Sequence, residues 1–311
     1  MFVYYPVMIT HDLSDRIAVV AGATRGAGRA IAIELGALGA TVYGTGRSTR
    51  EGRSVMDRPE TIEGTAERVT AAGGTGIAVR CDHSMPGEVA ALADRIGAEY
   101  GRVDILVNDV WGGDHLVDWE KKLWEHPLDD TLAVIRNGVE THVITSHHLL
   151  PLVLKSDGGL VVEVGDGKGE VPYRGNIAYD IVKSTVVRLA GSLNAELSPS
   201  GAMALSVTPG FLRSEAMLER IGVTEQNWHD AADFGGGFFV HSETPHLLGR
   251  GLAALAADPG RSRFAGDSLG SWDLMREYGV VDLDGRSPDW GSVDAEARRS
   301  IVDDGFPDVG A

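Results

Sequence analysis

The chain has 311 residues, 43% of them hydrophobic, which is enough for one large α/β domain with a substantial buried core. Its 45 acidic and 28 basic side chains give a formal net charge of −17, so no nucleic-acid or anionic-membrane surface is expected. The single cysteine, Cys81, rules out an intrachain disulfide and fits a reducing, cytoplasmic location, and we expect it to be a small buried residue.

The first residues of the chain are apolar, but the run is short. Pro6 interrupts it and no basic residue precedes it, which argues against a signal peptide or a membrane span. We therefore expect an N-terminal arm over residues 1–13 and no binding to membranes.

A strand is predicted over residues 16–22, and a glycine-rich turn and a helix that ends at Gly39 follow it directly. Such a turn brings the backbone and the helix N-terminus close to an anion, as in folds that hold the diphosphate of a dinucleotide. The glycine spacing is G-x-x-x-G-x-G rather than the common G-x-G-x-x-G. The turn residues expected to contact a cofactor are Gly22, Thr24, Arg25, Gly26, Ala27 and Gly28.

A second predicted strand, residues 40–44, leads to Arg47 and Ser48. NAD-selective folds place an acidic residue here to bind the ribose 2′-hydroxyl, but this chain has none. A guanidinium can bind a phosphate through two N–H groups, so Arg47 and Arg25 predict NADP(H) as the cofactor. Two weaker candidates for the same phosphate are Arg50 and Arg53.

Strands and helices then alternate regularly, which indicates βαβ units in a parallel sheet. Helices are predicted at 60–72 and 88–100, and strands at 76–80 and 103–108. Ligands of such sheets bind at the carboxyl ends of the strands. The polar residues at these ends are Asp82 and Asn108.

A long helix is predicted over residues 130–154, and it contains Asn137. Its three histidines lack the spacing of a metal site, so we expect no metal and interpret them as helix-surface or interface residues. They are His142, His147 and His148.

Residues 159–183 combine a buried strand, a glycine-broken loop and a helix that continues to Leu197. Tyr179 and Lys183 are four residues apart on this helix and therefore lie side by side. An ammonium beside a phenol stabilises the phenolate, so the pair predicts a group that gives and takes a proton.

The last third of the chain contains a strand at 202–208, then Pro209-Gly210 and Ser214. The segment 215–243 combines aromatic residues with three successive glycines, which predicts a mobile lid. A helix at 245–257 and a strand at 264–269 complete the sheet. We expect the domain to span 14–275, with a surface tail or an arm onto a neighbouring subunit over 276–311.

A substrate pocket is expected beside these strand ends. Three tryptophans follow Asn108, and they predict either a pocket for a bulky substrate or a closed core cluster. They are Trp111, Trp119 and Trp124. The residues that we assign to the pocket are Trp111, Gly167, Tyr173 and Phe211.

Taken together, these motifs resemble the short-chain dehydrogenase/reductase family over about residues 14–275. The resemblance implies one Rossmann-type doubly wound parallel sheet in a three-layer α/β/α domain, assembled as a homodimer or homotetramer. It implies that Tyr179 donates a proton to a substrate carbonyl, while Lys183 lowers the pKa of Tyr179 and holds the nicotinamide ribose. It also implies that Asn137 anchors a relay water, that Asp82 and Asn108 border the adenine, and that Pro209, Gly210 and Ser214 border the carboxamide.

The chain departs from the family at two places. The family's Asn-Asn-Ala-Gly is here Asn108-Asp109-Val110-Trp111, and Asp166 stands thirteen residues before Tyr179, where the family has a serine. Asp166 can be protonated and donate as serine would, or ionised and stabilise a cationic substrate such as an iminium, or it can point away and cap the loop.

The expected function is the NADPH-dependent reduction of a carbonyl on a bulky small molecule, with Tyr179 as proton donor. One alternative is an imine or iminium reductase that uses Asp166. The other is a non-catalytic sensor or scaffold that binds NADP(H), against which the retained Tyr179, Lys183 and Asn137 argue.

Overall fold

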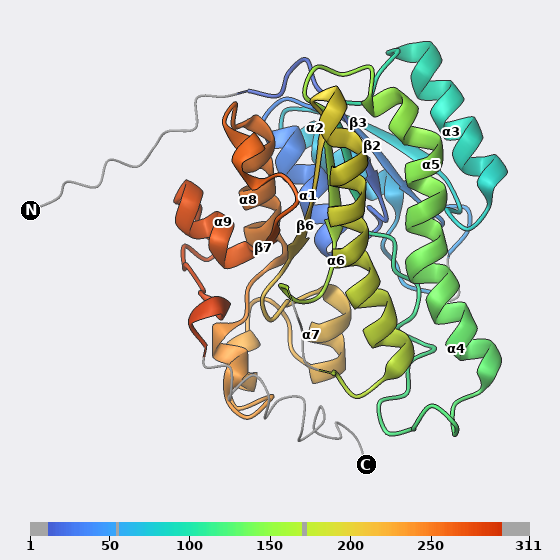
Figure 1. Cartoon of the computed structure of the whole chain (residues 1–311). Helices are drawn as coiled ribbons and strands as arrows, with labels where there is room; N and C mark the ends of the chain where they lie inside the picture. The colour runs from blue at the N-terminus through green and yellow to red at the C-terminus, as the bar shows by residue number, and fades with distance from the viewer. Residues whose placement is uncertain (1–11, 54–55, 170–172, 294–311) are drawn as a thin grey trace, which may run out of the picture.

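Seven parallel strands form one sheet at the centre of the molecule, in the order β3-β2-β1-β4-β5-β6-β7 (Figure 1). The computed structural model describes residues 12–53, 56–169 and 173–293, so most of the expected N-terminal arm and the end of the tail lie outside it. The chain is a single α/β domain, and the predicted Rossmann-type doubly wound sheet is confirmed. The strands are β1 (Ile17–Ala21), β2 (Thr41–Gly46), β3 (Thr75–Arg80), β4 (Ile105–Asn108), β5 (Leu160–Val164), β6 (Met203–Thr208) and β7 (Ser268–Gly270).

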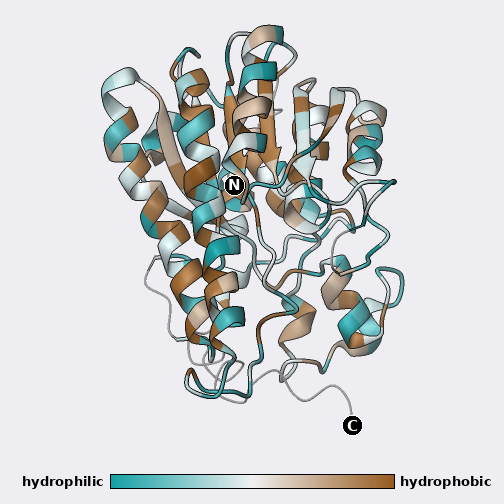
Figure 2. Ribbon diagram, turned by 90° about the vertical axis from the view of Figure 1, so that its right-hand side faces the viewer, coloured by the Kyte–Doolittle hydropathy of each residue, from teal (hydrophilic) through white to brown (hydrophobic). Residues whose placement is uncertain are grey.

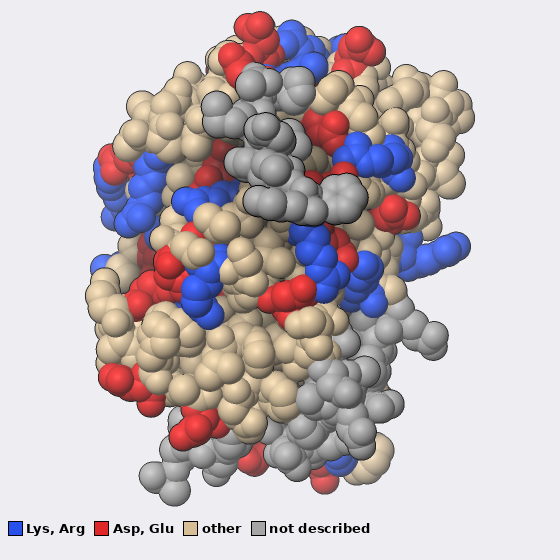
Figure 3. All heavy atoms as spheres, turned by 90° about the vertical axis from the view of Figure 1, so that its left-hand side faces the viewer, with Lys and Arg blue, Asp and Glu red and all other residues tan. Residues whose placement is uncertain are grey.

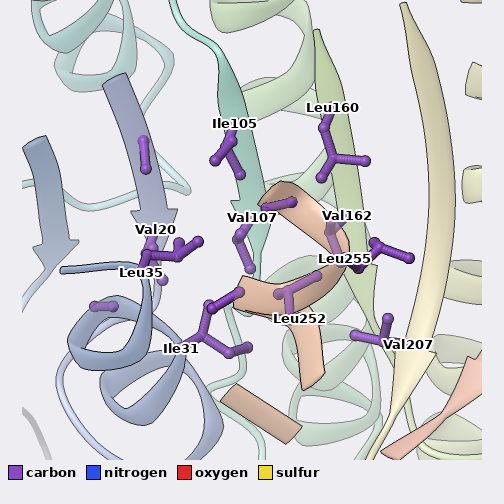
Figure 4. Close-up of a cluster of buried hydrophobic side chains, with 14 of the residues drawn as sticks. Val20, Ile31, Leu35, Ile105, Val107, Leu160, Val162, Val207, Leu252 and Leu255 are labelled. Carbon is purple, nitrogen blue, oxygen red and sulfur yellow. The ribbon is translucent and has the colours of Figure 1, made fainter. Parts of the chain in front are cut away.

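The central strands are mainly apolar because helices cover both faces of the sheet, although β5 also carries the buried Glu163. Alternate residues of one strand point to opposite faces: Val20 belongs to one core cluster and Val19 to the other. Figure 4 shows the first cluster, in which Ile31 and Leu252 pack from two helices against the sheet residues Val107 and Val162.

One helical layer supplies α1, α2, α8 and α9 to the first cluster, and the other supplies α3, α5 and α6 to the second. Figure 2 shows the hydrophobic colour concentrated in the strands between the two layers, with hydrophilic residues on the outer sides of the helices. The α-helices are α1 (Gly26–Ala37), α2 (Ile62–Ala71), α3 (Pro86–Glu99), α4 (Leu128–Ile135), α5 (Thr141–Val153), α6 (Ile177–Leu197), α7 (Glu215–Ile221), α8 (Pro245–Ala257) and α9 (Ser271–Tyr278).

The long helix predicted over 130–154 is interrupted. A π-helical turn, Arg136–Glu140, separates α4 from α5, and Asn137 lies in it. Thr141 contributes to this irregularity, because its hydroxyl donates to the carbonyl of Asn137 at 2.6 Å. Single π-turns inside helices are common at functional sites.

Aromatic residues of the last third of the chain pack together, and the mobile lid expected over residues 215–243 stays a prediction. Phe211, Trp228 and Phe239 form a buried aromatic cluster, on which Trp290 packs. The expected surface tail therefore packs on the domain as far as Val293, which is buried. Four 3₁₀ turns of the described residues belong to the last third of the chain: Trp228–Ala231, Phe238–His241, Arg261–Phe264 and Trp290–Ser292.

On the face drawn in Figure 3, Lys and Arg residues are interspersed with Asp and Glu residues, and neither charge forms a large patch. Among the described residues, no helix is long and apolar enough to cross a membrane.

Candidate active site

A cleft of about 1330 Å³ opens along the carboxyl ends of β1, β2, β4, β5 and β6. This volume exceeds the roughly 300–1,000 Å³ of a pocket for one small ligand. The cleft therefore has room for a dinucleotide together with a substrate.

The glycine turn between β1 and α1 forms one wall of the cleft. Gly22 has φ +89°, and a Cβ there would lie 2.2 Å from the carbonyl oxygen of Asp109. Gly26 has φ +58° and faces open space, whereas a Cβ on Gly28 would lie 2.5 Å from the carbonyl oxygen of Gly22. This open, glycine-lined N-terminus of α1 fits a dinucleotide diphosphate. Thr24, Arg25 and Ala27 also line the cleft.

The carboxyl end of β2 carries the predicted arginine and no carboxylate. Arg47 and Ser48 line the cleft, and the nearest ion pair of Arg47 is a loose one, at 3.9 Å from Asp82. Arg25 is 3.9 Å from Asp114. The two weaker candidates for the phosphate site do not line the cleft. Arg50 pairs with Glu67, and Arg53 pairs with Asp57.

The two strand-end residues expected beside the adenine lie in different places. Asp82 lines the cleft, together with the buried Cys81 and His83. Asn108 is fully buried and does not line it. Its amide nitrogen donates to Glu163 at 2.7 Å and to Ser146 at 3.1 Å, so Asn108 joins β4 to β5 and α5.

His142 belongs to the same buried network, which corrects its assignment to the helix surface. Its Nδ1 lies 2.5 Å from Glu163, and its Nε2 donates to the carbonyl of Val110 at 3.1 Å. Burial opposes the charged ring, but the Glu163 carboxylate outweighs it and raises the pKa of His142. The network anchors the strand end that leads into Asp109 and Val110.

Asp166, Tyr179 and Arg174 meet at the carboxyl end of β5. The Asp166 carboxylate accepts the Tyr179 hydroxyl and forms an ion pair with Arg174. Burial alone would raise the pKa of Asp166, but Arg174, Lys183 and the hydrogen bond from Tyr179 outweigh it and lower that pKa. The lowered pKa favours an ionised Asp166, and the contact with Tyr179 argues against an Asp166 that points away.

Tyr179 and Lys183 lie on one face of α6 as predicted. The Tyr179 ring contacts Trp111 and Trp119 edge-on, at centroid distances of 5.6 and 5.0 Å. The Lys183 ammonium lies over Trp111, 4.6 Å from the ring centroid, and 5.5 Å from that of Tyr179. The tryptophan pair thus forms a wall of the cleft, while Trp124 is exposed.

The pKa of Tyr179 shifts in the direction opposite to the one predicted. Burial and the Asp166 carboxylate raise the pKa of this phenol well above its ordinary value, although Lys183 is near. Burial lowers the pKa of Lys183. The main cause is burial, and the charge of Asp166, which directly contacts the hydroxyl, adds to it.

Asn137 reaches the cleft from the π-helical turn. Its side-chain amide donates to the carbonyl of Gly112 at 3.1 Å. The relay water that the family resemblance implies for Asn137 stays a prediction.

The remaining predicted residues divide between the cleft and the surface. Pro209, Gly210, Phe211 and Ser214 line the cleft, as does Gly167, whose N–H donates to Thr208 at 2.8 Å. Tyr173 is exposed and does not line it. Trp272 and Trp290 complete the aromatic wall, and sequence patterns gave no signal for either.

Comparison with known proteins agrees with this geometry. The family model for short chain dehydrogenases matches residues 16–222. The chain belongs to the short-chain dehydrogenase family. It is accordingly an oxidoreductase of a family that uses NAD(H) or NADP(H).

Curated relatives and solved structures extend the match. Human dehydrogenase/reductase SDR family member 1 is 31% identical over 277 residues, covering 88% of this chain and 85% of the relative. The Escherichia coli 3-oxoacyl-[acyl-carrier-protein] reductase FabG is 27% identical over 206 residues, covering 66% of this chain and 76% of the relative. A short chain dehydrogenase from Mycobacterium thermoresistibile shares the fold at a TM-score of 0.73 and 21% identity, covering 88% of this chain and 90% of that one.

Two features of this short-chain dehydrogenase site were not predicted from the sequence. Arg174 carried no signal, because it is one arginine in a glycine-broken loop. The sequence marks Asp109 only as a departure from the family motif. Burial raises the pKa of its carboxyl to about 7, although Lys183 and the hydrogen bond from the Gly28 N–H both lower that pKa. Among the described residues, no group of three or more His, Cys, Asp or Glu side chains could hold a metal ion.

Proposed function

We propose that the chain is an NADPH-dependent reductase of a carbonyl group on a bulky small molecule. The observation that carries the proposal is that Tyr179, in contact with Trp111 and Trp119, lines the same cleft as the glycine turn. A bound nicotinamide would supply the hydride to the carbonyl carbon.

Tyr179 is the proton donor to the carbonyl oxygen in this proposal. Its raised pKa keeps the phenol protonated at neutral pH but makes it a weaker acid than free tyrosine, so proton transfer needs compensation from nearby cations. After transfer, the phenolate lies near two cations, Lys183 and Arg174, which stabilise it until a proton returns from solvent.

The preference for NADPH rests on the end of β2. Arg47 and Arg25 both line the cleft with loose ion pairs of 3.9 Å, so both can turn to a 2′-phosphate. A Pseudomonas aeruginosa RhlG/NADP complex shares the fold at a TM-score of 0.65 and 24% identity, covering 86% of this chain and 97% of that one.

The alternative of an iminium reductase is supported less well. It needs Asp166 as a net negative charge beside the substrate, and Arg174 neutralises that charge. A neutral Asp166–Arg174 pair suits the reduction of a carbonyl better, because the carbonyl oxygen becomes negative during the reaction.

The proposed assembly is a homodimer or homotetramer formed through the long helices. Leu128 and Leu132 on α4, Val143 on α5 and Ile181 on α6 are exposed apolar residues on neighbouring helices. Light scattering of the purified protein tests this part.

The reaction is tested by following NADPH absorbance with panels of bulky ketones, aldehydes and imines. We expect oxidation of NADPH with carbonyl substrates, and a loss of turnover of at least a hundredfold in Tyr179→Phe. Turnover of imines alone, or full activity of Tyr179→Phe, would falsify the proposal.

A further inference from the structure

The position that carries a serine in the family carries no hydrogen-bond donor in this chain. Asp166 stands there, and an ionised carboxylate only accepts hydrogen bonds. No Ser or Thr occurs between Gly159 and Tyr179. A carbonyl oxygen that approaches Tyr179 would therefore meet one donor, the phenol, and one repelling group, the carboxylate.

We propose that Arg174 supplies the missing donor to the substrate oxygen, and that Asp166 is the residue that positions Arg174 beside Tyr179. This inference rests on the proposed reduction of a carbonyl. Arg174 lines the cleft, forms its ion pair with Asp166 and contacts the Tyr179 hydroxyl. Its guanidinium has five N–H groups, so binding Asp166 leaves others for a ligand.

The loop before α6 holds Arg174 in this position. Gly175 has φ +89°, which turns the chain directly after the arginine. The side chain of Asn176 caps α6 by accepting the Tyr179 N–H at 3.1 Å, and it donates to the carbonyl of Asp118 at 3.2 Å. Arg174 is therefore fixed relative to Tyr179 by the same cap that begins the helix.

Other donors near the phenol already have partners. The Asn137 amide binds the carbonyl of Gly112, the Thr208 hydroxyl binds that of Pro209, and Lys168 pairs with Asp273. The Lys183 ammonium lies over Trp111, 4.6 Å from its ring centroid, and 5.5 Å from the centroid of the Tyr179 ring. Among the described cleft residues, Arg174 is the cation in direct contact with the group that gives the proton.

The pairing also explains how Tyr179 can release its proton. The hydroxyl has one hydrogen, which it donates to Asp166 in this structure. When the hydroxyl turns to a substrate, Asp166 keeps Arg174 as a partner and is not left as an unpaired partly buried charge. The guanidinium meanwhile faces the oxygen on which negative charge develops.

Substitutions at both positions test the donor role. Arg174→Met should lower kcat by about 10²–10³-fold, the cost of removing one oxyanion donor, with a smaller effect on KM. Arg174→Lys should retain part of the activity. The decisive comparison removes the charge of Asp166 but keeps an acceptor oxygen for the guanidinium: Arg174→Met should still lower kcat at least tenfold in an Asp166→Asn background, because a donor acts on the substrate itself. If the arginine only neutralises the carboxylate, it has no effect there, and the proposal fails.

A rescue separates the donor role from a structural role. The double variant Asp166→Ser with Arg174→Met restores the family's serine, and it should recover activity that Arg174→Met alone loses. Failure to recover, with both proteins folded by circular dichroism, contradicts the proposal.

A measurement without turnover tests the pair itself. Carboxyl ¹³C NMR, with the Asp166 signal assigned from Asp166→Asn, should show its pKa rise in Arg174→Met; an unchanged pKa contradicts the pairing. The neighbouring charges that the titration must consider are Arg174, Lys183 and Tyr179. An inactive wild-type protein refutes the proposed function and the donor role together, whereas an active one with an unaffected Arg174→Met variant refutes only the donor role.

Discussion

The carboxylate of Glu215, at the start of α7, accepts the backbone N–H of Gly26, at the start of α1, at a distance of 2.9 Å. Its other oxygen lies 3.5 Å from Arg29. A helix N-terminus in a glycine turn is the place where dinucleotide folds bind a diphosphate. The Glu215 carboxylate therefore accepts the same N–H group that the diphosphate of a dinucleotide would bind.

Removing this charge should strengthen cofactor binding. In Glu215→Gln, a diphosphate no longer displaces a carboxylate from Gly26 and Arg29, so we expect the Kd for NADPH to fall several-fold, measured by calorimetry. Glu219→Gln is the matched control, since it removes the same charge from the same helix at an exposed position that pairs with Arg58. Equal effects of the two variants, or weaker binding by Glu215→Gln, contradict the prediction.

Arg47 should determine the choice between the two nicotinamide cofactors. A hydrogen-bonded charge pair contributes about 1.5–3 kcal/mol, so Arg47→Gln should weaken NADPH binding by roughly 10–100-fold and leave NADH binding unchanged. Arg47→Asp should go further and favour NADH.

The control for this experiment is Arg50→Gln, because Arg50 is a nearby cation that pairs with Glu67 and does not line the cleft. If Arg47→Gln and Arg50→Gln behave alike, the 2′-phosphate does not bind at the end of β2.

The sheet and its glycine turn were predictable because each is a local pattern. A strand buried on both faces, such as β5, is mainly apolar, and a turn in which a Cβ on Gly22 would lie 2.2 Å from the carbonyl oxygen of Asp109 must contain glycine. The family resemblance added the roles of Tyr179 and Lys183.

The contacts that were missed join segments far apart in the sequence. Nothing local in His142 distinguishes a surface histidine from one buried against Glu163, 21 residues away. Only the packing of the whole chain brings Trp290 to the cleft. Arg174, by contrast, is only eight residues from Asp166, but it lies in a glycine-broken loop that carries no motif. The raised pKa of Tyr179 has burial as its main cause and the Asp166 charge as the next, and the burial of a side chain depends on the whole fold.

Asp109 should make cofactor binding depend on pH. Burial raises the pKa of its carboxyl to about 7, and it accepts the Gly28 N–H inside the glycine turn. As pH rises through 7 the carboxylate forms and repels an anionic diphosphate, so NADPH affinity should fall between pH 6 and 8. Lys183, His142 and Arg25 are the cations that face Asp109 and limit the effect.

Titrating NADPH into wild type and Asp109→Asn at each pH isolates this group, because the ligand's own ionisation is common to both. We expect a flatter profile for the variant. Asp114→Asn is the control, since it removes an exposed carboxylate from the same loop and should keep the wild-type slope. Parallel profiles for wild type and Asp109→Asn contradict the prediction.

Glu243 should make the stability of the fold fall as pH rises. Its side chain is fully buried, one oxygen accepts the Ser271 hydroxyl at 2.6 Å, and the other has no hydrogen-bond partner. Burial raises its pKa to about 8. Since the unfolded carboxyl ionises near its ordinary pKa, of about 4.5, the folded state holds an extra proton between these values, and the contribution of Glu243 to the free energy of unfolding decreases from about pH 4.5 to about pH 8.

Glu243→Gln removes this titration while keeping the shape of the side chain. The variant should gain stability relative to wild type as pH rises, on the order of 2–4 kcal/mol by pH 9, and little or nothing at pH 5. Urea unfolding at a series of pH values measures the difference, and Glu196→Gln on the exposed side of α6 is the control. A difference between wild type and Glu243→Gln that stays constant with pH would show that Glu243 does not carry a proton in the folded state.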